Sequence, residues 1–505
     1  MLVNNLLILT SLVLVNAEFD APASDQLTGG YTYCEAGLPN PETYKPLFKD
    51  GKLITTIWMG RHGDRTPINY LPQGHEKDAW NCALEQTHVH NVTFVQSTKY
   101  FKNSCNPADS PFNYCSLNPY SSLYWPGSCS TGQLTPKGMA YQFKLGQNLN
   151  KIYIEQLKFL NKDWHSAKKD VFVRATDVWR THQSAISLMS GMFPYNYNQQ
   201  FTPQQFKKYE LPIYSLPTET EYILPNPKNC PNLANLELKV RESVPMQKLL
   251  NQTLVDRKNF LSIVVDSNTT KRVEYAKAYD FAYFTDILQA RTCHKMPAIC
   301  NLKDGSKCVT QEIIDNTMVA GNTQYRLLFR DNEHQFPSLA KLRMGAFLLE
   351  MKRTLLSHVA KNIDSKKLVD YNHSSIKQMG ELKKLYYYSA HDTSIIPLLG
   401  AINATDMRWP PYSSNMQFEL WKKDCTSKDL DQFHLRAFYN GNPLITSWCN
   451  GTCKLTSFLN FLDKKLNLIG GFEAYLEESI TSKPFNLVEE CFKDVITTPN
   501  PNGTS

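Results

Sequence analysis

The residues best suited to chemistry lie in one short segment, residues 61–67, whose sequence is RHGDRTP. The imidazole of His62 stands here between the guanidinium groups of Arg61 and Arg65. Guanidinium groups bind the oxygens of a phosphate in a bidentate manner, while a neutral imidazole can attack the phosphorus atom. The segment therefore predicts a nucleophilic histidine in an anion-binding loop, because packing alone gives no reason for this combination of residues.

The position of this segment indicates where partners should be found. An apolar run over 53–59 precedes it and predicts a buried strand. In an open α/β sheet, ligands bind at the carboxyl ends of strands, so polar segments after other strands should converge on the same place. Two further segments fit this description: residues 173–181, VRATDVWRT, after a strand over 170–173, and residues 389–393, SAHDT, after a strand over 385–388.

Together the three segments contain the groups that phosphoryl transfer requires. His62 would act as the nucleophile and form a phosphohistidine. Asp392 would protonate the leaving alcohol and then help to activate the water that cleaves the intermediate. Cationic and hydrogen-bonding groups would bind the phosphate oxygens in the transition state; they are Arg61, Arg65, Arg180 and His391. We expect no metal and no other cofactor, because side chains supply the cations.

These residue types also predict how activity depends on pH. The flanking arginines disfavour the imidazolium form, so the pKa of His62 should fall below the free value of about 6.5. An aspartic acid must be protonated to act as an acid, and free aspartate titrates near about 3.9. We therefore expect an acidic optimum, at about pH 4 to 6.

Structural roles are the alternative for the two later segments. A His-Asp pair such as His391 and Asp392 is common in proteins of many kinds. Arg174 and Arg180 lie near acidic residues in the sequence and could form only surface ion pairs, which contribute little to stability. The RHGDRTP segment favours the functional interpretation of both, since it needs an acid and further cations.

Strands that alternate with helices favour an α/β fold with a mostly parallel sheet. Thr135 and Pro136 should begin one helix, since threonine is a good N-cap and proline fits the first helical position. Another helix should begin at Pro337, and a fourth strand should span 433–438. We expect one catalytic unit over 18–505, with a core at about 50–67, 133–200 and 336–490, and mainly helical or loop cap insertions at about 68–132 and 200–335.

Composition bounds the class of protein. The chain has 505 residues, 42% of them hydrophobic, and a net charge of +7. This length and hydrophobic content allow a large buried core. No block of five or more basic residues occurs, so we expect no nucleic-acid partner.

The N-terminus and the cysteines predict the secretory pathway. Residues 6–15 are apolar and Ala17 closes a small-residue cleavage site, so residues 1–17 predict a signal peptide. The stretch is shorter than the roughly 18 apolar residues of a membrane span, so we expect no stable span after cleavage; an uncleaved anchor is the alternative. Glycosylation sequons occur at Asn91, Asn251, Asn268, Asn372, Asn403, Asn450 and Asn502.

The chain has 13 cysteines, all after the predicted cleavage site. In an oxidising compartment most would pair and one would be left over. Cys449 and Cys453 predict a small disulfide loop. Two other clusters, Cys105, Cys115 and Cys129, and Cys293, Cys300 and Cys308, lack the paired spacing of a zinc site and also favour disulfides.

The three polar segments, with residues 132–135, GQLT, resemble the histidine acid phosphatases, the branch of the histidine phosphatase superfamily that includes lysosomal and prostatic acid phosphatases and phytases. The resemblance implies a phosphoglycerate mutase-like α/β core with a helical cap, and hydrolysis of phosphate monoesters through a phosphohistidine on His62 with Asp392 as general acid. It also implies a phosphorylated small molecule or glycan as substrate, in a secreted protein or one of the lysosomal or Golgi lumen, and allows a homodimer.

Several features are similar to the 2-phosphoxylose phosphatase members of this family, which act in the Golgi lumen on the glycosaminoglycan linker. They are the insert 68–132, the cysteine cluster over 293–308, and residues 163–164, 408–410, 418–421 and 439–441. The substrate could thus be 2-phosphoxylose. A broad-specificity lysosomal or secreted acid phosphatase is an alternative. A phytase-like enzyme is disfavoured by the few Lys and Arg of the insert. A secreted glycoprotein that only binds phosphate esters is the non-enzymatic alternative, and a phosphoglycerate mutase-like transferase is disfavoured by Asp64.

Overall fold

The computed structural model describes residues 33–69, 77–82, 125–194, 211–264, 281–330, 339–363, 381–466, 468 and 487–492. The predicted signal peptide, four of the seven sequons (Asn91, Asn268, Asn372 and Asn502), and Cys105 and Cys115 lie outside these residues.

One eight-stranded sheet forms the centre of the fold, in the order β3-β2-β4-β1-β5-β6-β7, with β8 paired to β6. The strands β3, β2, β4 and β1 are parallel, and the pairings from β1 to β5 onward are antiparallel. Their bounds are β1 Lys52–Arg61, β2 Val171–Ala175, β3 Ile213–Tyr214, β4 Leu385–Ala390, β5 Asn415–Lys422, β6 Phe433–Tyr439, β7 Asn442–Pro443 and β8 Thr452–Lys454.

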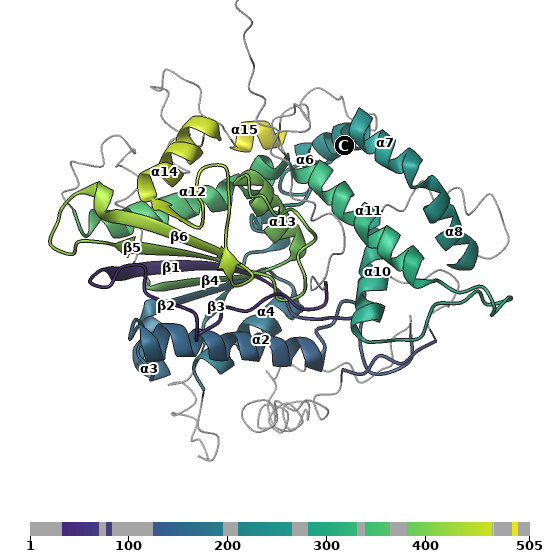
Figure 1. Ribbon diagram of the computed structural model, residues 1–505, viewed down its shortest axis with the longest axis horizontal. Helices are drawn as coiled ribbons and strands as arrows, with labels where there is room; N and C mark the ends of the chain where they lie inside the picture. Colours follow the sequence, from purple (N-terminus) through teal and green to yellow (C-terminus); the bar gives the residue numbers. More distant parts are fainter. Residues whose placement is uncertain are drawn as a thin grey trace, which may run out of the picture.

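Helices cover both faces of this sheet, so the protein has three layers (Figure 1). One face carries α2 Pro136–Leu149, α3 Trp164–Ala167 and α4 Trp179–Met192, and the other carries α12 Leu339–Ala360, α13 Asp392–Ala401 and α14 Leu455–Asn460. The two faces of β4 separate the two hydrophobic cores: Tyr387 packs with the core of α2 and α4, while Tyr388 packs with that of α12 and α13. This alternation is the period-two pattern of a strand buried on both faces.

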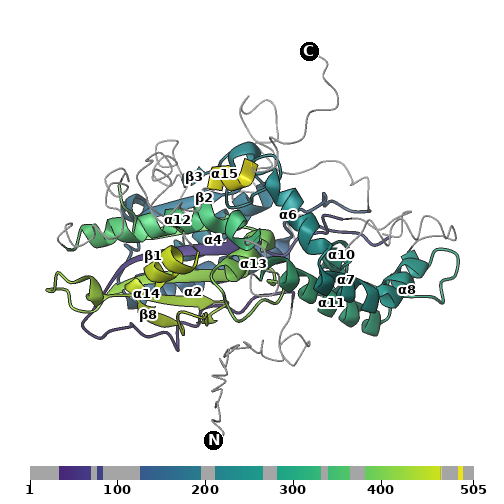
Figure 2. The ribbon, with the colours of Figure 1, turned by 90° about the horizontal axis from the view of Figure 1, so that it is seen from above.

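A helical segment between β3 and α12 extends beyond one end of the sheet in both ribbon views (Figures 1 and 2). It comprises α6 Asn232–Arg241, α7 Val244–Gln252, α8 Leu254–Val264, α10 Phe281–Cys293 and α11 Gln311–Phe329. A short C-terminal helix, α15 Leu487–Phe492, packs on α6 and α12.

The predicted α/β class is confirmed. All four predicted strands are present, as β1, β2, β4 and β6, and so is the helix predicted to begin after Thr135. Thr135 is the N-cap of α2 and accepts a hydrogen bond from the Gly138 amide, as its position before Pro136 predicted. The helix predicted from Pro337 is described from Leu339 onward. The antiparallel strand β5 was not predicted, although apolar Met416, Phe418 and Leu420 alternate in it with polar Gln417 and Glu419.

Disulfides join segments that are far apart in the sequence. Five are described: Cys34–Cys293, Cys82–Cys129, Cys230–Cys491, Cys300–Cys308 and Cys449–Cys453. The predicted small loop at Cys449 is thus confirmed, and Cys425 is an exposed free thiol. So many disulfides indicate an oxidising compartment. Among the described residues, no helix is both long and apolar enough to cross a membrane.

The contact between α2 and α4 leads to a first prediction, on stability. The backbones approach so closely at Gly146 that a methyl group there would collide with the carbonyl oxygen of Leu188. We expect Gly146→Ala to lower the free energy of unfolding by about 3 kcal/mol, because the two helices must separate. Thermal and denaturant unfolding would measure this loss. The matched control is Gly305→Ala, since no atom lies within 4 Å of a methyl group there. Equal stability of the two variants would contradict the packing argument.

Candidate active site

The three polar segments begin at the same edge of the sheet because their strands are parallel neighbours. Arg61, the last residue of β1, is in register with Ala390, the last residue of β4. Ala175, the last residue of β2, is in register with Ser389. The chain then leaves the sheet still hydrogen-bonded to it, since the His62 amide donates to the Ala390 carbonyl at 3.0 Å. The register alone therefore brings the predicted site residues together.

His62 is held in one orientation and one tautomer. Its side chain is buried, with 1% of the residue exposed. Nδ1 lies 2.8 Å from the Gly63 carbonyl oxygen, which can only accept, so Nδ1 carries the proton. Nε2 then presents its lone pair, and the Nε–H of Arg65 points to it at 3.4 Å. Burial, followed by the charges of Arg180 and Arg65, holds the pKa of His62 well below 6.5. The imidazole is therefore neutral and its Nε2 is available as a nucleophile.

Two of the three arginines already have carboxylate partners. Nη2 of Arg61 lies 2.6 Å from Oδ2 of Asp392, and its guanidinium stacks over the Tyr412 ring at 4.4 Å. Nη1 of Arg65 lies 2.7 Å from Oδ1 of Asp286. Both guanidinium groups are buried, so these contacts fix them in place.

Arg180, the second residue of α4, is the least neutralised of the three. Among the described residues it forms no ion pair, and its Nε is buried without a hydrogen-bond partner. Burial and the nearby charge of Arg65 lower the pKa of Arg180 to about 9. An anion bound between these groups would relieve that repulsion, so Arg180 favours phosphate binding most strongly.

The third segment contributes His391 and Asp392. Nδ1 of His391 accepts from Arg180 at 3.4 Å, so Nε2 donates to Oγ1 of Thr176 at 2.8 Å. Burial and the charges of Arg180 and Arg65 hold the pKa of His391 well below 6.5. The rings of His391 and His62 meet edge to face, with centroids 5.4 Å apart. Asp392 begins α13 and accepts the Thr393 amide at 2.7 Å, which orients its carboxyl group toward Arg61.

The structure thus brings together all six residues that the sequence analysis selected, namely Arg61, His62, Arg65, Arg180, His391 and Asp392. Arg174 is not among them, and the surface ion pair considered for it is wrong. Its side chain is buried on the face of the sheet that carries α12, where it pairs with Glu221 at 2.6 Å and stacks on Tyr222. The corresponding alternative for Arg180 is also wrong, because its guanidinium is enclosed by the site.

Four supporting residues were not predicted. Thr176 binds His391, Ser184 accepts the Gly63 amide at 3.0 Å, Tyr412 stacks on Arg61, and Asp286 pairs with Arg65. Thr176 stands directly after a predicted strand, so its position was a usable signal. Asp286 lies within a helix of the segment between β3 and α12 and has no local signal at all.

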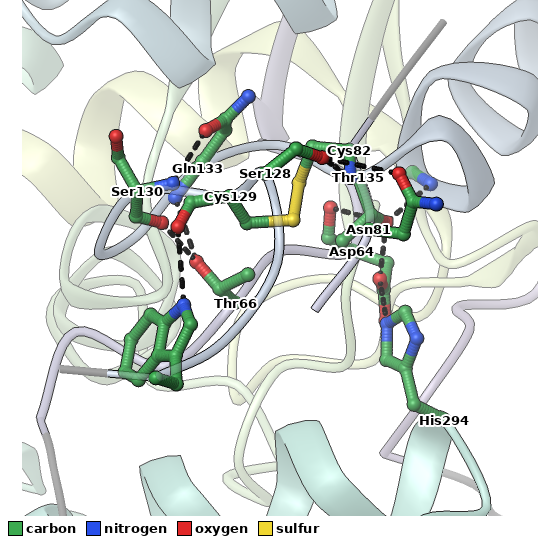
Figure 3. Close-up of a disulfide and its surroundings, with 12 residues drawn as sticks. Asp64, Thr66, Asn81, Cys82, Ser128, Cys129, Ser130, Gln133, Thr135 and His294 are labelled. Atoms are coloured by element: carbon green, nitrogen blue, oxygen red, sulfur yellow. Dashed lines mark hydrogen bonds and ion pairs between the residues drawn. A yellow bond between two sulfur atoms is a disulfide. The ribbon is translucent and has the colours of Figure 1, made fainter. Parts of the chain in front are cut away.

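A hydrogen-bonded network supports the loop from the side of the Cys82–Cys129 disulfide (Figure 3). Oγ1 of Thr66 donates to the Ser130 carbonyl at 2.7 Å and accepts the Gln133 amide at 2.9 Å. On the other side of the disulfide, the Asp64 carboxylate accepts from Thr135 and from Nε2 of His294. Asp64 and Thr66, the two polar residues of the RHGDRTP segment without a predicted catalytic role, therefore both anchor it by hydrogen bonds.

Comparison with known proteins decides what this site belongs to. The family model for the histidine phosphatase superfamily (branch 2) matches residues 52–440. The chain belongs to this family. Human lysophosphatidic acid phosphatase type 6 is 26% identical over 414 residues, which cover 81% of this chain and 82% of that protein. Bovine lysosomal acid phosphatase is 25% identical over 356 residues, which cover 70% and 74%.

A solved structure agrees on the fold. The phytase from Citrobacter braakii superposes with a TM-score of 0.50 at 16% identity, covering 82% of this chain and 98% of the phytase. The chain is thus a branch 2 histidine phosphatase with the α/β fold of that family. Its relatives hydrolyse phosphate monoesters, and this chain is a phosphatase.

The depressed pKa of His62 leads to a prediction for this histidine phosphatase. A group whose pKa is lowered keeps its deprotonated form as the pH falls, so His62 stays a neutral nucleophile well below pH 6.5. We expect kcat/KM to show no acidic limb at about pH 6.5, the value of a free histidine. The profile should be measured with an aryl phosphate and corrected for the substrate, whose second ionisation lies near about pH 6. An acidic limb that remains at that pH after correction would contradict the prediction.

Proposed function

We propose that this phosphatase works through a phosphohistidine on His62, with Asp392 as the general acid. The observation that carries the proposal is the tautomer of His62: its Nδ1 proton is fixed on Gly63, while Nε2 faces Arg65 beside Arg61 and Arg180. A structural histidine would be placed among acceptors. This one is placed among cations, which favour a bound anion in front of the nucleophilic atom.

The first step transfers the phosphoryl group to the enzyme. Nε2 of His62 forms a bond to phosphorus as the bond between phosphorus and the ester oxygen breaks, and Asp392 gives its proton to that oxygen. The three arginines bind the equatorial oxygens, which carry the charge in the transition state. His391 acts through Arg180: its Nε2 donates to Thr176 and its Nδ1 accepts from Arg180, so it orients that guanidinium toward the phosphate.

The second step releases phosphate. A water molecule attacks phosphorus from the side that the alcohol has left, and the Asp392 carboxylate accepts its proton. The bond between phosphorus and Nε2 then breaks, and His62 returns to its neutral form.

The substrate is a separate question, and two compounds are the leading candidates. 2-Phosphoxylose was suggested by motif positions that mostly serve the fold: Asp163 caps α3, Arg408 pairs with Asp406, and Glu419 pairs with Arg436. Lysophosphatidic acid is suggested by the name of a relative, and the alignment covers most of this chain and most of that relative. We propose a phosphate monoester of an alcohol, with these two as the compounds to compare.

The test uses the full chain, produced through the secretory pathway so that its disulfides form. Turnover of a radiolabelled phosphate ester is stopped in alkali, where a phosphohistidine survives, and peptide mapping should place the label on His62. Parallel assays compare an aryl phosphate, a 2-phosphoxylosyl linker oligosaccharide and lysophosphatidic acid. Label on another residue would overturn the mechanism, and a strong preference for one ester would settle the substrate class.

We also propose that the reaction takes place in the lumen of the secretory pathway or outside the cell. The disulfides support this, since they persist in oxidising compartments. Among the described sequons, Asn251 and Asn450 are exposed, so both can carry a glycan. Glycosidase treatment of the secreted protein, followed by mass mapping, would test both points.

A further inference from the structure

Helix α10 and the residue after it make contact with the RHGDRTP segment at two points. Asp286, within the helix, pairs with Arg65, and His294, just after its end, binds Asp64 at 2.6 Å. Ala290 lies midway between them and is fully buried. Because these three residues are four apart, they lie along one face of the helix. That face is therefore aligned along the loop that carries His62.

Asp286 uses both of its oxygens on this loop. Oδ1 accepts from Nη1 of Arg65 at 2.7 Å. Oδ2 accepts the backbone amides of Ile68 at 2.8 Å and Asn69 at 3.0 Å, and the Asn69 side chain also points to it. The Asp286 carboxylate thus fixes both Arg65 and the backbone just after the RHGDRTP segment.

The geometry of Arg65 shows what this contact determines. Its Nη1 is occupied by Asp286 and by the Thr66 carbonyl at 3.0 Å. The Nε edge of the same planar group is consequently turned toward Nε2 of His62. Since the guanidinium is rigid, fixing one end fixes the direction of the other N–H groups.

We propose that Asp286 is a positioning residue for phosphoryl transfer, which aims the Arg65 guanidinium at the phosphoryl group on His62. The proposal rests on the proposed function, because it assumes that Arg65 binds that group. It adds a fourth segment of the chain to the site, since Asp286 lies in α10, 221 residues from Arg65. The segment between β3 and α12 then takes part in catalysis as well as bounding the site.

A merely structural role is the competing explanation, in which Asp286 only holds α10 onto the core. The two differ in how Asp286 couples to Arg65. A positioning residue acts through its partner, so removing it has no further effect once Arg65 is gone. A structural residue impairs the enzyme to the same degree with or without Arg65.

A double-mutant cycle of Asp286→Asn and Arg65→Ala separates them, with kcat/KM measured on a fluorogenic aryl phosphate. We expect Asp286→Asn to lower kcat/KM by about 100-fold in the otherwise native enzyme, the cost of a misplaced catalytic group. In the Arg65→Ala background it should change kcat/KM by less than about twofold. Tungstate, a tetrahedral oxyanion, serves as the inhibitor. Asp286→Asn should raise its inhibition constant in the otherwise native enzyme and leave it unchanged in the Arg65→Ala background.

The controls are Asp286→Glu and Glu312→Gln. Asp286→Glu retains the charge and should recover part of the activity; it also replaces Asp286→Asn in the cycle if that variant is unfolded at the assay temperature. Glu312→Gln removes an exposed carboxylate from α11 and should be neutral. Equal losses in both backgrounds, or native activity of Asp286→Asn, would overturn the proposal. An Arg65→Ala enzyme with native activity would instead refute the proposed function of Arg65.

Discussion

Replacing His62 with alanine should lower kcat on an aryl phosphate by at least about 10⁴-fold, the scale found when a nucleophile is removed from an otherwise intact enzyme. The bound phosphate would keep its arginines but lose the atom that attacks phosphorus. Stopped turnover should then yield no labelled protein, because no covalent intermediate can form. Steady-state assays, together with alkaline trapping of the phosphoenzyme, measure both effects.

The matched control is His165→Ala, which removes an exposed imidazole from α3 and should leave kcat unchanged. Unfolding curves of the two variants should be similar, since the cavity left by His62 is bounded by polar groups and can hold water. If His62→Ala retained even a tenth of native kcat, direct attack by water would have to replace the phosphohistidine.

The part of the site that could be predicted from sequence is the part that follows strands. His62, Arg180 and His391 were selected because each lies just after an apolar run or at the helix start that follows one. The register of β1, β4 and β2 then makes their convergence unavoidable. Sequence-local signals are sufficient here, because parallel strands end at a common edge whatever the rest of the chain does.

The supporting groups could not be predicted in this way. Asp286 reaches Arg65 across 221 residues, and nothing in the local sequence of α10 distinguishes this aspartate from a solvated one. The pairing of Cys34 with Cys293 is equally remote in sequence. The antiparallel strand β5 is a different case: apolar Met416, Phe418 and Leu420 alternate with polar residues, so a local signal for this strand was present in the sequence.

Charge explains why the site needs such remote partners. Arg61, Arg65 and Arg180 lie together in a buried region, where like charges repel strongly. Asp392 and Asp286 each pair with one arginine, whereas burial and the charge of Arg65 lower the pKa of Arg180 to about 9. Among the described residues, Arg180 is thus the cation of the site without a carboxylate partner, and a phosphate ester can bind to it without first displacing a carboxylate.

Replacing Asp392 with asparagine should have the second largest effect, and its form should depend on the leaving group. For an alkyl phosphate we expect kcat to fall by about 10³-fold, because an alkoxide must leave without a proton. A nitrophenolate can leave unprotonated, so the first step should stay fast with nitrophenyl phosphate. The second step still lacks its base. Rapid mixing should therefore show a burst of one nitrophenol per active site, followed by slow turnover.

This burst distinguishes an acid–base role from loss of the ion pair with Arg61. The control is Glu221→Gln, which breaks a comparable buried pair, that of Arg174 at 2.6 Å, outside the six site residues. Its effect should fall on stability and be the same for every ester. If Asp392→Asn slowed alkyl and nitrophenyl esters equally and gave no burst, Asp392 would be a partner that orients Arg61, and the proton for the leaving alcohol would have to come from another donor. The burst is expected because one carboxyl group serves two steps, and only the first of them can proceed without it when the leaving group is a weak base.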